Sequence, residues 1–369
     1  MTSHTAPTPM PTVMLVSELF APGGIQHVGR DTVAALAAAS TPLAVWSLRD
    51  GAVPLDYAAP AHTAFRLAAG SKVALGAWAM KRACRRCDDT QVLLMHVHLA
   101  PVALPMLLRG ARVVLMLYGV EAWRPLTAVE RFVVERASRV IAISAYTAQR
   151  FRNANPWMRD RPIDVCWLGV PADAEPADGS ACADGALIVS RMSAEDRYKG
   201  HEPLIRAWVG VRRSVPDATL VIVGDGDDRQ RLESLAAELG LDGAVRFAGR
   251  LPDRELAGCY ARCAFFVMPS PDEGFGLVFL EAMRAGKACI GSTGAAEEVI
   301  VDGVTGAIVP PHDEAALVGA LVRLFQDRTA RSTLGANGRR RFEEQFTLAH
   351  FAARLRRLLQ TDTSIGASA

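Results

Sequence analysis

Residues 264–286 read AFFVMPSPDEGFGLVFLEAMRAG, and three patterns follow one another within this stretch. The apolar, aromatic run at its start is typical of a buried strand that ends at about Ser270. A turn with two glycines comes next, and the residues from about Gly276 onward have helix character. Because a strand, a glycine turn and a helix in this order are typical of parallel sheets, the stretch predicts a doubly wound α/β fold.

Short apolar runs alternate with helix-length segments along the rest of the chain. The runs of the first half are TVMLVSEL (12–19), PLAVWSL (42–48), QVLLMHVH (91–98), ARVVLML (111–117), RVIAIS (139–144) and IDVCWLG (163–169). After a stretch rich in proline, alanine and aspartate, the runs ALIVS, TLVIVGD, VRFAG, AFFVMPS, KACIGS and TGAIVP restart the pattern. The alternation predicts two doubly wound, Rossmann-like domains in series, joined by a linker at 171–186.

The domain boundaries follow from this alternation and from the length of 369 residues, which is more than one hydrophobic core normally supports. We expect an N-terminal domain at 12–170, a C-terminal domain at 187–345, and a helix at 346–360 that packs back on the N-terminal domain. The ends, 1–11 and 361–369, are expected to be disordered. Since ligands bind at the carboxyl ends of parallel strands, we expect the site in a central cleft between the domains.

The cysteines and the first residues bear on the compartment. Seven cysteines show no paired secretory spacing, and Cys84 and Cys87 form a C-x-x-C with no second pair at zinc-site spacing. The opening residues lack the basic start and apolar core of an export signal, and no membrane-spanning run is apparent. These features predict reduced thiols in a cytoplasmic protein.

Charge is divided unevenly along the chain. Residues 1–171 hold 18 lysines and arginines against 11 acidic residues, whereas the remainder holds 23 against 28. The segment KVALGAWAMKRACRRC, residues 72–87, is basic and amphipathic. An uneven solvated surface explains the division of charge equally well, and a surface helix packed on its own sheet is the commoner explanation of residues 72–87. The functional interpretation is a peripheral contact of the N-terminal domain with the inner face of an anionic cell membrane. No nucleic-acid partner is predicted.

Two glutamates mark the stretch at 264–286. Glu273 lies in the glycine turn, and Glu281 lies five residues inside the helix, a displacement of about 7.5 Å at the usual helical rise. Free backbone N–H groups make a helix start an anion site, and glycines let a phosphate approach the backbone. Alone, each glutamate is explained as a helix-capping or surface carboxylate. Together they suit the two ends of one ligand with a diphosphate between them.

Two cations are expected at the same edge of the second sheet. In ALIVSRMSAEDRYKGHEPLI, residues 186–205, Arg191 follows a strand and Lys199 precedes a helix. Ordinary loop charges explain either residue alone. As a pair they would neutralise a departing diphosphate.

These residues carry a resemblance to a known family. The stretch SPDEGFGLVFLEAMRAGKACIGSTGAAEEVIVDGVTGAIVPP, residues 270–311, resembles the donor-site signature of retaining GT-B glycosyltransferases of family 4. The matching residues are Glu273, Glu281, Gly294, Glu298 and Asp302-Gly303-Val304-Thr305-Gly306. The resemblance extends over essentially the whole chain and includes the Gly23-Gly24 turn, VIVGDGD and FAGRLPDREL.

The resemblance implies a GT-B enzyme that moves a hexose from a UDP- or GDP-sugar to a glycan or lipid-linked acceptor, as in cell-surface polysaccharide or glycolipid synthesis. It implies that Glu273 contacts the donor sugar, that Glu281 holds the ribose, and that the two cations grip the diphosphate. Backbone contacts to the donor are implied for Gly23, Gly24, Gly274, Phe275, Gly276 and Leu277. The products would keep the anomeric configuration of the donor, by an attack of the acceptor on the face that the leaving phosphate occupies.

The chain departs from the family on the acceptor side. Many relatives carry a histidine after the strand that corresponds to 111–117, where this chain has Tyr118 and, slightly later, Glu121. A tyrosine, with a usual pKa of about 10, is no base at neutral pH. The nearby alternatives are His96 and His98, for which a core and a surface imidazole are the plain explanations. We take His98 as a candidate catalytic residue with Glu273, Arg191 and Lys199, and Tyr118 and Glu121 as acceptor-side candidates.

Neither a metal nor a redox cofactor is predicted. Asp225-Gly226-Asp227 resembles a metal-binding D-x-D, but it lies where the family has a glycine turn beneath the nucleotide, and the two cations already supply positive charge. The Gly23-Gly24 turn lacks the full G-x-G-x-x-G pattern of nicotinamide sites. The nucleotide sugar is therefore expected as a substrate, without a cofactor.

Two alternatives remain open from the sequence. A nucleotide-sugar epimerase can share the architecture, and it would convert the donor with no acceptor present. A catalytically silent nucleotide-sugar binder is favoured only by Tyr118 in place of the family histidine.

Overall fold

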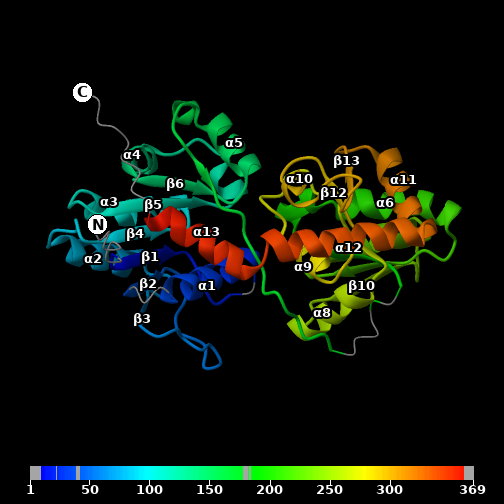
Figure 1. The fold of residues 1–369 in the computed structure, drawn as a ribbon, viewed down its shortest axis with the longest axis horizontal. Helices are drawn as coiled ribbons and strands as arrows, with labels where there is room; N and C mark the ends of the chain where they lie inside the picture. Colours follow the sequence, from blue (N-terminus) through cyan, green and yellow to red (C-terminus); the bar gives the residue numbers. More distant parts are fainter. Residues whose placement is uncertain (1–9, 22, 39–41, 178–181, 183, 361–369) are drawn as a thin grey trace, which may run out of the picture. The chain divides into compact units, whose positions relative to one another are not determined.

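The computed structural model describes residues 10–21, 23–38, 42–177, 182 and 184–360, and the chain divides into two compact units (Figure 1). The first unit runs to residue 168 and includes the residues from 349 onward. The second unit runs from 169 to 348. Of the ends expected to be disordered, 1–11 and 361–369, residues 1–9 and 361–369 lie outside the described residues, whereas the carbonyl of Pro11 accepts from the N–H of Gln91 (3.0 Å).

The first unit is built on a seven-stranded parallel sheet of order β3-β2-β1-β4-β5-β6-β7. Its strands are β1 (Thr12–Val16), β2 (Leu43–Ser47), β3 (Thr63–Leu67), β4 (Gln91–Leu94), β5 (Arg112–Leu117), β6 (Arg139–Ala142) and β7 (Asp164–Val165). Its helices are α1 (Gly24–Ala37), α2 (Lys72–Ala83), α3 (Ala100–Leu107), α4 (Ala128–Arg136), α5 (Ala145–Ala154) and α13 (Leu348–Gln360), with short 3₁₀ turns η1 (Val97–Leu99), η2 (Val120–Ala122) and η3 (Pro156–Met158).

Two details of this sheet differ from the sequence-based prediction. The edge strand β3 was not predicted, because its sequence TAFRL alternates half-buried and exposed residues instead of forming an apolar run. The run at 91–98 is a strand only as far as Leu94, and Val97–Leu99 form a 3₁₀ turn. His96 and His98 therefore lie beyond the carboxyl end of β4.

The second unit holds a six-stranded parallel sheet of order β10-β9-β8-β11-β12-β13. Its strands are β8 (Ala186–Val189), β9 (Leu220–Val223), β10 (Val245–Gly249), β11 (Phe265–Met268), β12 (Cys289–Ser292) and β13 (Gly306–Val309). Its helices are η5 (Ala194–Lys199), α6 (His201–Ser214), α7 (Arg229–Glu238), α8 (Asp253–Arg262), α9 (Leu277–Arg284), α10 (Ala296–Val299), α11 (Glu314–Gln326) and α12 (Arg328–Gln345).

The central strands of the second sheet explain its uninterrupted apolar runs. Every residue of β8, β9, β11 and β12 is buried, which requires helices on both faces of the sheet. These four strands carry no charged side chain, so the charged groups near them lie in the loops beyond the strand ends. Within the described ranges, no helix is both long enough and apolar enough to span a membrane.

The segments near the two unit boundaries are bonded to the unit in which they are counted. Residues 171–177, the described start of the linker expected at 171–186, are counted with the second unit, and Ala177 N–H donates to the carbonyl of Arg254 (2.9 Å). Gly169 and Val170, expected to end the N-terminal domain, are counted there too, and Val170 N–H donates to the carbonyl of Phe346 (3.1 Å). Helix α13 is counted in the first unit from Ala349 onward, and the Arg354 guanidinium donates to the carbonyl of Trp167 (2.9 Å). The cleft expected between the domains stays a prediction.

One correction concerns the cysteines. Cys182 and Cys259 form a disulfide that ties the segment before β8 to helix α8, so the prediction of reduced thiols is wrong for these two residues. Their Cα atoms lie 4.9 Å apart, within the range that a disulfide spans. A sequence separation of 77 residues gives no spacing signal for this pair. The remaining cysteines of the chain are free thiols.

Candidate active site

The connection from β8 to α6 carries both predicted cations. After Ser190, the chain forms the 3₁₀ segment η5, which begins with the Ser193 hydroxyl accepting from the N–H of Glu195 (3.3 Å). The segment ends at Gly200 in the left-handed region, with φ of 85°. A Cβ at Gly200 would stand 2.8 Å from the carbonyl oxygen of Pro269. A glycine is therefore required for the connection to approach the end of β11.

This close approach brings Lys199 to Glu273. The Lys199 Nζ donates to Glu273 Oε2 at 2.6 Å, and the two side chains are only 18% and 15% exposed. Burial lowers the pKa of Lys199, but the charge and hydrogen bond of Glu273, together with Tyr198 and Asp196, outweigh this effect, and the pKa is raised above its ordinary value. The lysine is therefore a fixed cation over the neutral range. Sequence reasoning placed both residues at this edge but did not predict that they form a pair.

The second predicted cation, Arg191, is bonded to Asp196 through its Nε atom. Arg191 Nε donates to Asp196 Oδ2 at 2.6 Å, and this bond raises the pKa of Arg191. The Asp196 side chain is 9% exposed, whereas that of Arg191 is 72% exposed. The carboxylate thus holds the root of the guanidinium while most of the arginine side chain faces solvent. Asp196 was missed by sequence reasoning, although it lies within the quoted segment.

The glycine turn of the stretch at 270–286 ends at the start of α9. Gly276 has φ of 89° and leads into the helix at Leu277, and it has no side chain with which to cap the helix. The first N–H groups of a helix lack partners within the helix and attract anions. Phe275 is buried, and its ring lies 6.1 Å from that of Phe346. Phe275 can therefore serve a donor only through its backbone, as predicted for this turn.

Glu281, the second glutamate of the pair, has a partner that the sequence did not indicate. The buried Tyr260 hydroxyl on α8 donates to Glu281 Oε2 at 2.7 Å. This bond fixes the direction of the carboxylate on α9. The two residues lie on different helices, so no periodic pattern in the sequence could have paired them.

The acidic turn after β9 has structural contacts. Cβ atoms at Gly224 and Gly226 would stand 2.0 and 2.1 Å from the carbonyl oxygens of Ser190 and Met192, so this turn packs directly on the backbone that leads to η5. The Asp227 carboxylate accepts from the N–H of Ala194 at 2.8 Å. In the described part of the chain, no cluster of three or more His, Cys, Asp and Glu residues is arranged to hold a metal ion. The expected independence of metals stays a prediction.

The D-G-x-T-G motif of the family closes the turn into β13. Asp302 Oδ1 accepts from the N–H of Ile308 (2.9 Å), and the Thr305 hydroxyl accepts from the N–H of Val301 (2.9 Å). A Cβ at Gly306 would stand 2.0 Å from the carbonyl oxygen of Cys289. These contacts explain the motif by folding, without a ligand.

The first unit gathers a polar cluster at the carboxyl ends of β1 and β4. His98 Nε2 lies 2.6 Å from the Ser17 hydroxyl, and the rings of His96 and His98 are 5.3 Å apart. Burial, then the charge of Arg49, lowers the pKa of His98, so the ring is neutral at pH 7. His96 is nine-tenths buried, and burial lowers its pKa to about 4. Sequence reasoning missed Ser17.

The two acceptor-side candidates after β5 lie inside the unit. The Tyr118 ring is buried, and its hydroxyl lies 3.4 Å from the sulfur of Met95. Burial raises the pKa of Tyr118 well above its ordinary value. Glu121 Oε1 accepts from the N–H groups of Tyr118 (2.8 Å) and Gly119 (3.1 Å), which uses this oxygen to hold the turn. These contacts give both residues a part in packing or turn formation, and their place on the acceptor side stays a prediction, whereas His98 is exposed at this edge.

The predicted glycine turn of the first unit lies at the start of α1. Gly23 precedes the helix with φ of 154°, and Gly24 is its first residue. Nearby, the Asp50 carboxylate accepts from the N–H of Leu19 (2.7 Å) and from the Ser47 hydroxyl (2.6 Å). These bonds hold the end of β1, where the chain turns toward α1.

Comparison with known proteins bears on both units. The family "Glycosyl transferases group 1" matches residues 183–341, and "Glycosyltransferase Family 4" matches residues 22–174. The chain is 31% identical over 285 residues to the GDP-mannose-dependent alpha-(1-6)-phosphatidylinositol monomannoside mannosyltransferase of Mycolicibacterium smegmatis, which covers 70% of this chain and 74% of that protein. It is 27% identical over 277 residues to the lipopolysaccharide core biosynthesis mannosyltransferase LpcC of Rhizobium leguminosarum bv. viciae, covering 73% and 74%.

Among solved structures, Anabaena HepE in complex with UDP and glucose matches with a TM-score of 0.76 and 21% identity, over 95% of this chain and 99% of that chain. The likeness shows the fold, and the relatives show the family. The two parallel α/β sheets, with the matched family regions in both units, place the chain among the family 4, group 1 glycosyltransferases, as a hexosyltransferase with the GT-B fold.

Proposed function

We propose that the protein is a retaining glycosyltransferase that moves a hexose from a GDP- or UDP-sugar to a lipid-linked or glycan acceptor, in the synthesis of a cell-surface glycolipid or polysaccharide. The observation that carries the proposal is the mostly buried Lys199–Glu273 pair, with Arg191 at the same sheet edge. The names of the two mannosyltransferase relatives support GDP-mannose as the first donor to test.

The charges at this edge suit the departure of a nucleoside diphosphate. As the bond between the sugar C1 and the phosphate oxygen breaks, negative charge grows on the diphosphate, and Arg191 and Lys199 stabilise it. The acceptor oxygen forms the new bond to C1 on the same face, and its proton passes to the departing phosphate oxygen. The Glu273 carboxylate orients Lys199 and accepts a hydrogen bond from a hydroxyl of the donor sugar. We propose that this transfer needs neither a metal ion nor a cofactor.

The remaining parts of the donor, its ribose and its diphosphate, would be bound by helix α9 and the turn before it. Glu281, whose carboxylate is oriented by Tyr260, would accept hydrogen bonds from the ribose hydroxyls, and the backbone from Gly274 to Leu277 would face the diphosphate. In the first unit we propose that His98, held at Ser17, hydrogen-bonds a neighbouring hydroxyl of the acceptor, while the proton of the reacting hydroxyl passes to the departing phosphate. A neutral imidazole suits that role, which agrees with the lowered pKa of His98.

The donor and the stereochemistry are tested together. Incubation with GDP-mannose, UDP-glucose and other nucleotide sugars, with and without a lipid extract as acceptor source, is expected to give transfer that depends on the acceptor. NMR of the product from an α-linked donor is expected to show an α-linkage. A β-linked product would contradict retention, and conversion of the donor without any acceptor would favour the epimerase.

The first unit also supports a membrane contact. On α2, Val73 and Met80 are 83% and 60% exposed, and they lie seven positions apart, on one face of the helix. Basic residues flank this apolar face: Lys72, Lys81, Arg85 and Arg86. Because an exposed apolar face with basic flanks binds anionic bilayers, we propose that the enzyme works peripherally on the inner, cytoplasmic face of the cell membrane.

The membrane contact predicts a charge-dependent association with vesicles. The triple variant Lys81→Glu, Arg85→Glu, Arg86→Glu is expected to lose at least about tenfold in binding to anionic phosphatidylglycerol vesicles, since each cation near such a surface contributes about 1 kcal/mol. Sedimentation with vesicles measures the loss. The triple variant Arg328→Glu, Arg339→Glu, Arg340→Glu, at exposed positions of α12, changes the net charge by the same amount and is the control. Equal binding of wild-type protein to anionic and to purely zwitterionic vesicles would refute the electrostatic contact.

A further inference from the structure

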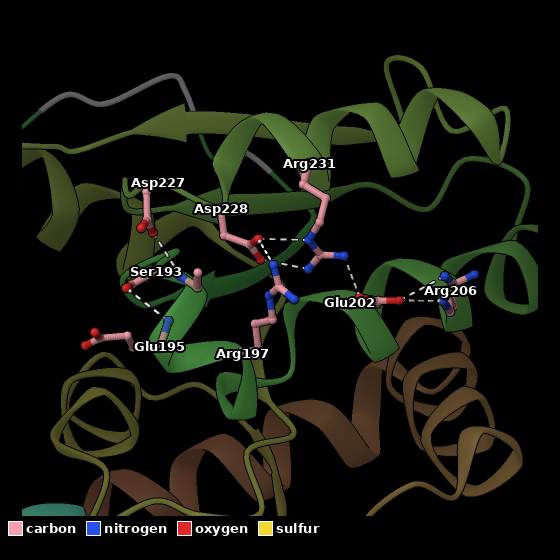
Figure 2. A network of polar contacts seen from close by, with 9 residues as sticks. Ser193, Glu195, Arg197, Glu202, Arg206, Asp227, Asp228 and Arg231 are labelled. Carbon is pink, nitrogen blue, oxygen red and sulfur yellow. Dashed lines mark hydrogen bonds and ion pairs between the residues drawn. The ribbon is translucent and has the colours of Figure 1, made fainter.

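A chain of alternating charges lies beside the segment η5, which carries Lys199 (Figure 2). It links Arg197 on η5, Asp228 before α7 and Arg231 on α7, and continues through Glu202 to Arg206 on α6. Asp228 is its centre. The function proposed above uses none of these residues.

Asp228 accepts hydrogen bonds from two different elements. Its Oδ1 accepts from Arg197 Nη2 (2.9 Å) and Arg231 Nε (2.8 Å), and its Oδ2 accepts from Arg231 Nη2 (2.7 Å). The side chain is 5% exposed, and it makes no capping bond to α7, although it stands at the N-cap position of that helix. The bonds from the arginines, chiefly from Arg231, hold the pKa of Asp228 down to about 2 despite burial. The ionised Asp228 carboxylate thus links η5 to α7 through hydrogen bonds to Arg197 and Arg231.

The tether acts on the segment between the two cations. Asp228 N–H donates to the carbonyl of Met192 (3.0 Å), one residue after Arg191, and Arg197 lies two residues before Lys199. A 3₁₀ segment has poor internal hydrogen-bond geometry, and η5 is also kinked at Asp196. Its shape therefore depends on contacts from outside, and Figure 2 shows Arg197 reaching from η5 to Asp228.

Exposed ion pairs of the same unit differ from the Asp228 contacts in burial and in the number of elements that they join. Arg229 and Glu233 on α7 form an i,i+4 pair whose side chains are 31% and 42% exposed. Such pairs contribute little, whereas a buried carboxylate with three charge-assisted bonds imposes one geometry. Asp228 spans separate elements, while Arg229–Glu233 stays within one helix.

We infer that Asp228 is a positioning residue for diphosphate recognition: through Arg197 it holds η5 so that Arg191 and Lys199 are presented together to the two phosphates of the donor. The inference rests on the proposed function, because it assigns those two cations to the diphosphate. Asp228 itself contacts neither the sugar nor the phosphates.

The test compares ligands with one and two phosphates. Arg197→Ala removes the η5 end of the tether and leaves Asp228 paired with Arg231, so the buried carboxylate keeps a partner. In calorimetry, this variant and Asp228→Asn are expected to weaken GDP binding about tenfold and GMP binding much less. Glu233→Gln, which breaks the exposed pair on α7, is expected to bind both nucleotides like wild type. In a double-mutant cycle, the loss from Arg197→Ala is expected to shrink in a Lys199→Ala background, because both act on the same contact.

The outcomes separate this inference from the proposed function. If the wild-type protein binds nucleoside diphosphates and Arg197→Ala binds GDP as tightly as the wild type does, Asp228 does not position the cations. If Arg197→Ala weakens GMP and GDP equally, the network only stabilises the fold, and the inference is overturned. If the wild-type protein binds neither diphosphate, the proposed function fails and the inference fails with it.

Discussion

Lys199→Ala is expected to lower kcat/KM for the nucleotide sugar by about 10²–10³-fold, the loss typical of removing one preorganised donor from developing charge. Lys199 is the less exposed of the two cations at this edge (18% against 72% for Arg191), and its Nζ lies 2.6 Å from Glu273 Oε2. Its removal deprives the departing diphosphate of a positive charge and leaves the Glu273 carboxylate without this partner. Steady-state kinetics measures the loss, with the donor identified among the nucleotide sugars tested above. Calorimetry with GDP or UDP measures how much of the loss is already present in the binding of the nucleoside diphosphate.

The control for Lys199→Ala is Arg339→Ala, which removes a cation from an exposed i,i+4 pair on α12. This variant is expected to retain wild-type kinetics, since exposed pairs contribute little. If Lys199→Ala binds the nucleoside diphosphate and turns over as wild type does, the assignment of the phosphate site to this edge is wrong. Arg191→Ala is the second check on that assignment.

Glu273→Gln is expected to lower kcat by about 10–100-fold, because it replaces hydrogen bonds to a charged group, which contribute about 1.5–3 kcal/mol, with weaker neutral ones. It is also expected to change the pH profile. In the wild type, the carboxylate raises the pKa of Lys199 against the opposing effect of burial. Without that charge the lowering by burial is opposed only by the smaller effects of Tyr198 and Asp196, so the lysine loses its proton at a lower pH than in the wild type. The alkaline limb of kcat/KM therefore moves to lower pH.

The pH shift distinguishes a charge effect from a general defect. Glu343→Gln, on the exposed face of α12, is the matched control and is expected to keep the wild-type profile. An unshifted alkaline limb in Glu273→Gln would mean that the pair does not govern the charge of Lys199. Full turnover with the true acceptor would mean that the carboxylate makes no important contact with the donor.

Much of the fold was predictable because it depends on local pattern. The apolar strands of the second unit are buried on both faces, so they appear in the sequence as uninterrupted runs. Strand β3 escaped prediction because an edge strand buries only part of its surface, and TAFRL alternates accordingly. The Cys182–Cys259 disulfide escaped for a different reason, since only the folded chain brings the two residues together.

The site was predictable as a set of residues but not as an arrangement. Spacing placed Glu273, Arg191 and Lys199 in loops beyond strand ends, where parallel sheets bind ligands. Spacing could not separate His98, which is exposed and bonded to Ser17, from Tyr118, which is buried beside methionine sulfur. Both follow apolar runs, and their burial depends on which way the chain turns after the strand.

The sequence by itself determined the two α/β units, the family and the loops that carry the candidate donor residues, because periodicity and short motifs record local structure. The tertiary structure alone decided the partners: Glu273 for Lys199, Tyr260 for Glu281, and Asp228 for Arg197. Each of these pairs joins segments that are 21 to 74 residues apart in the chain. Such contacts depend on how strands are ordered in the sheet and how closely glycines such as Gly200 let the loops approach, which no local pattern encodes.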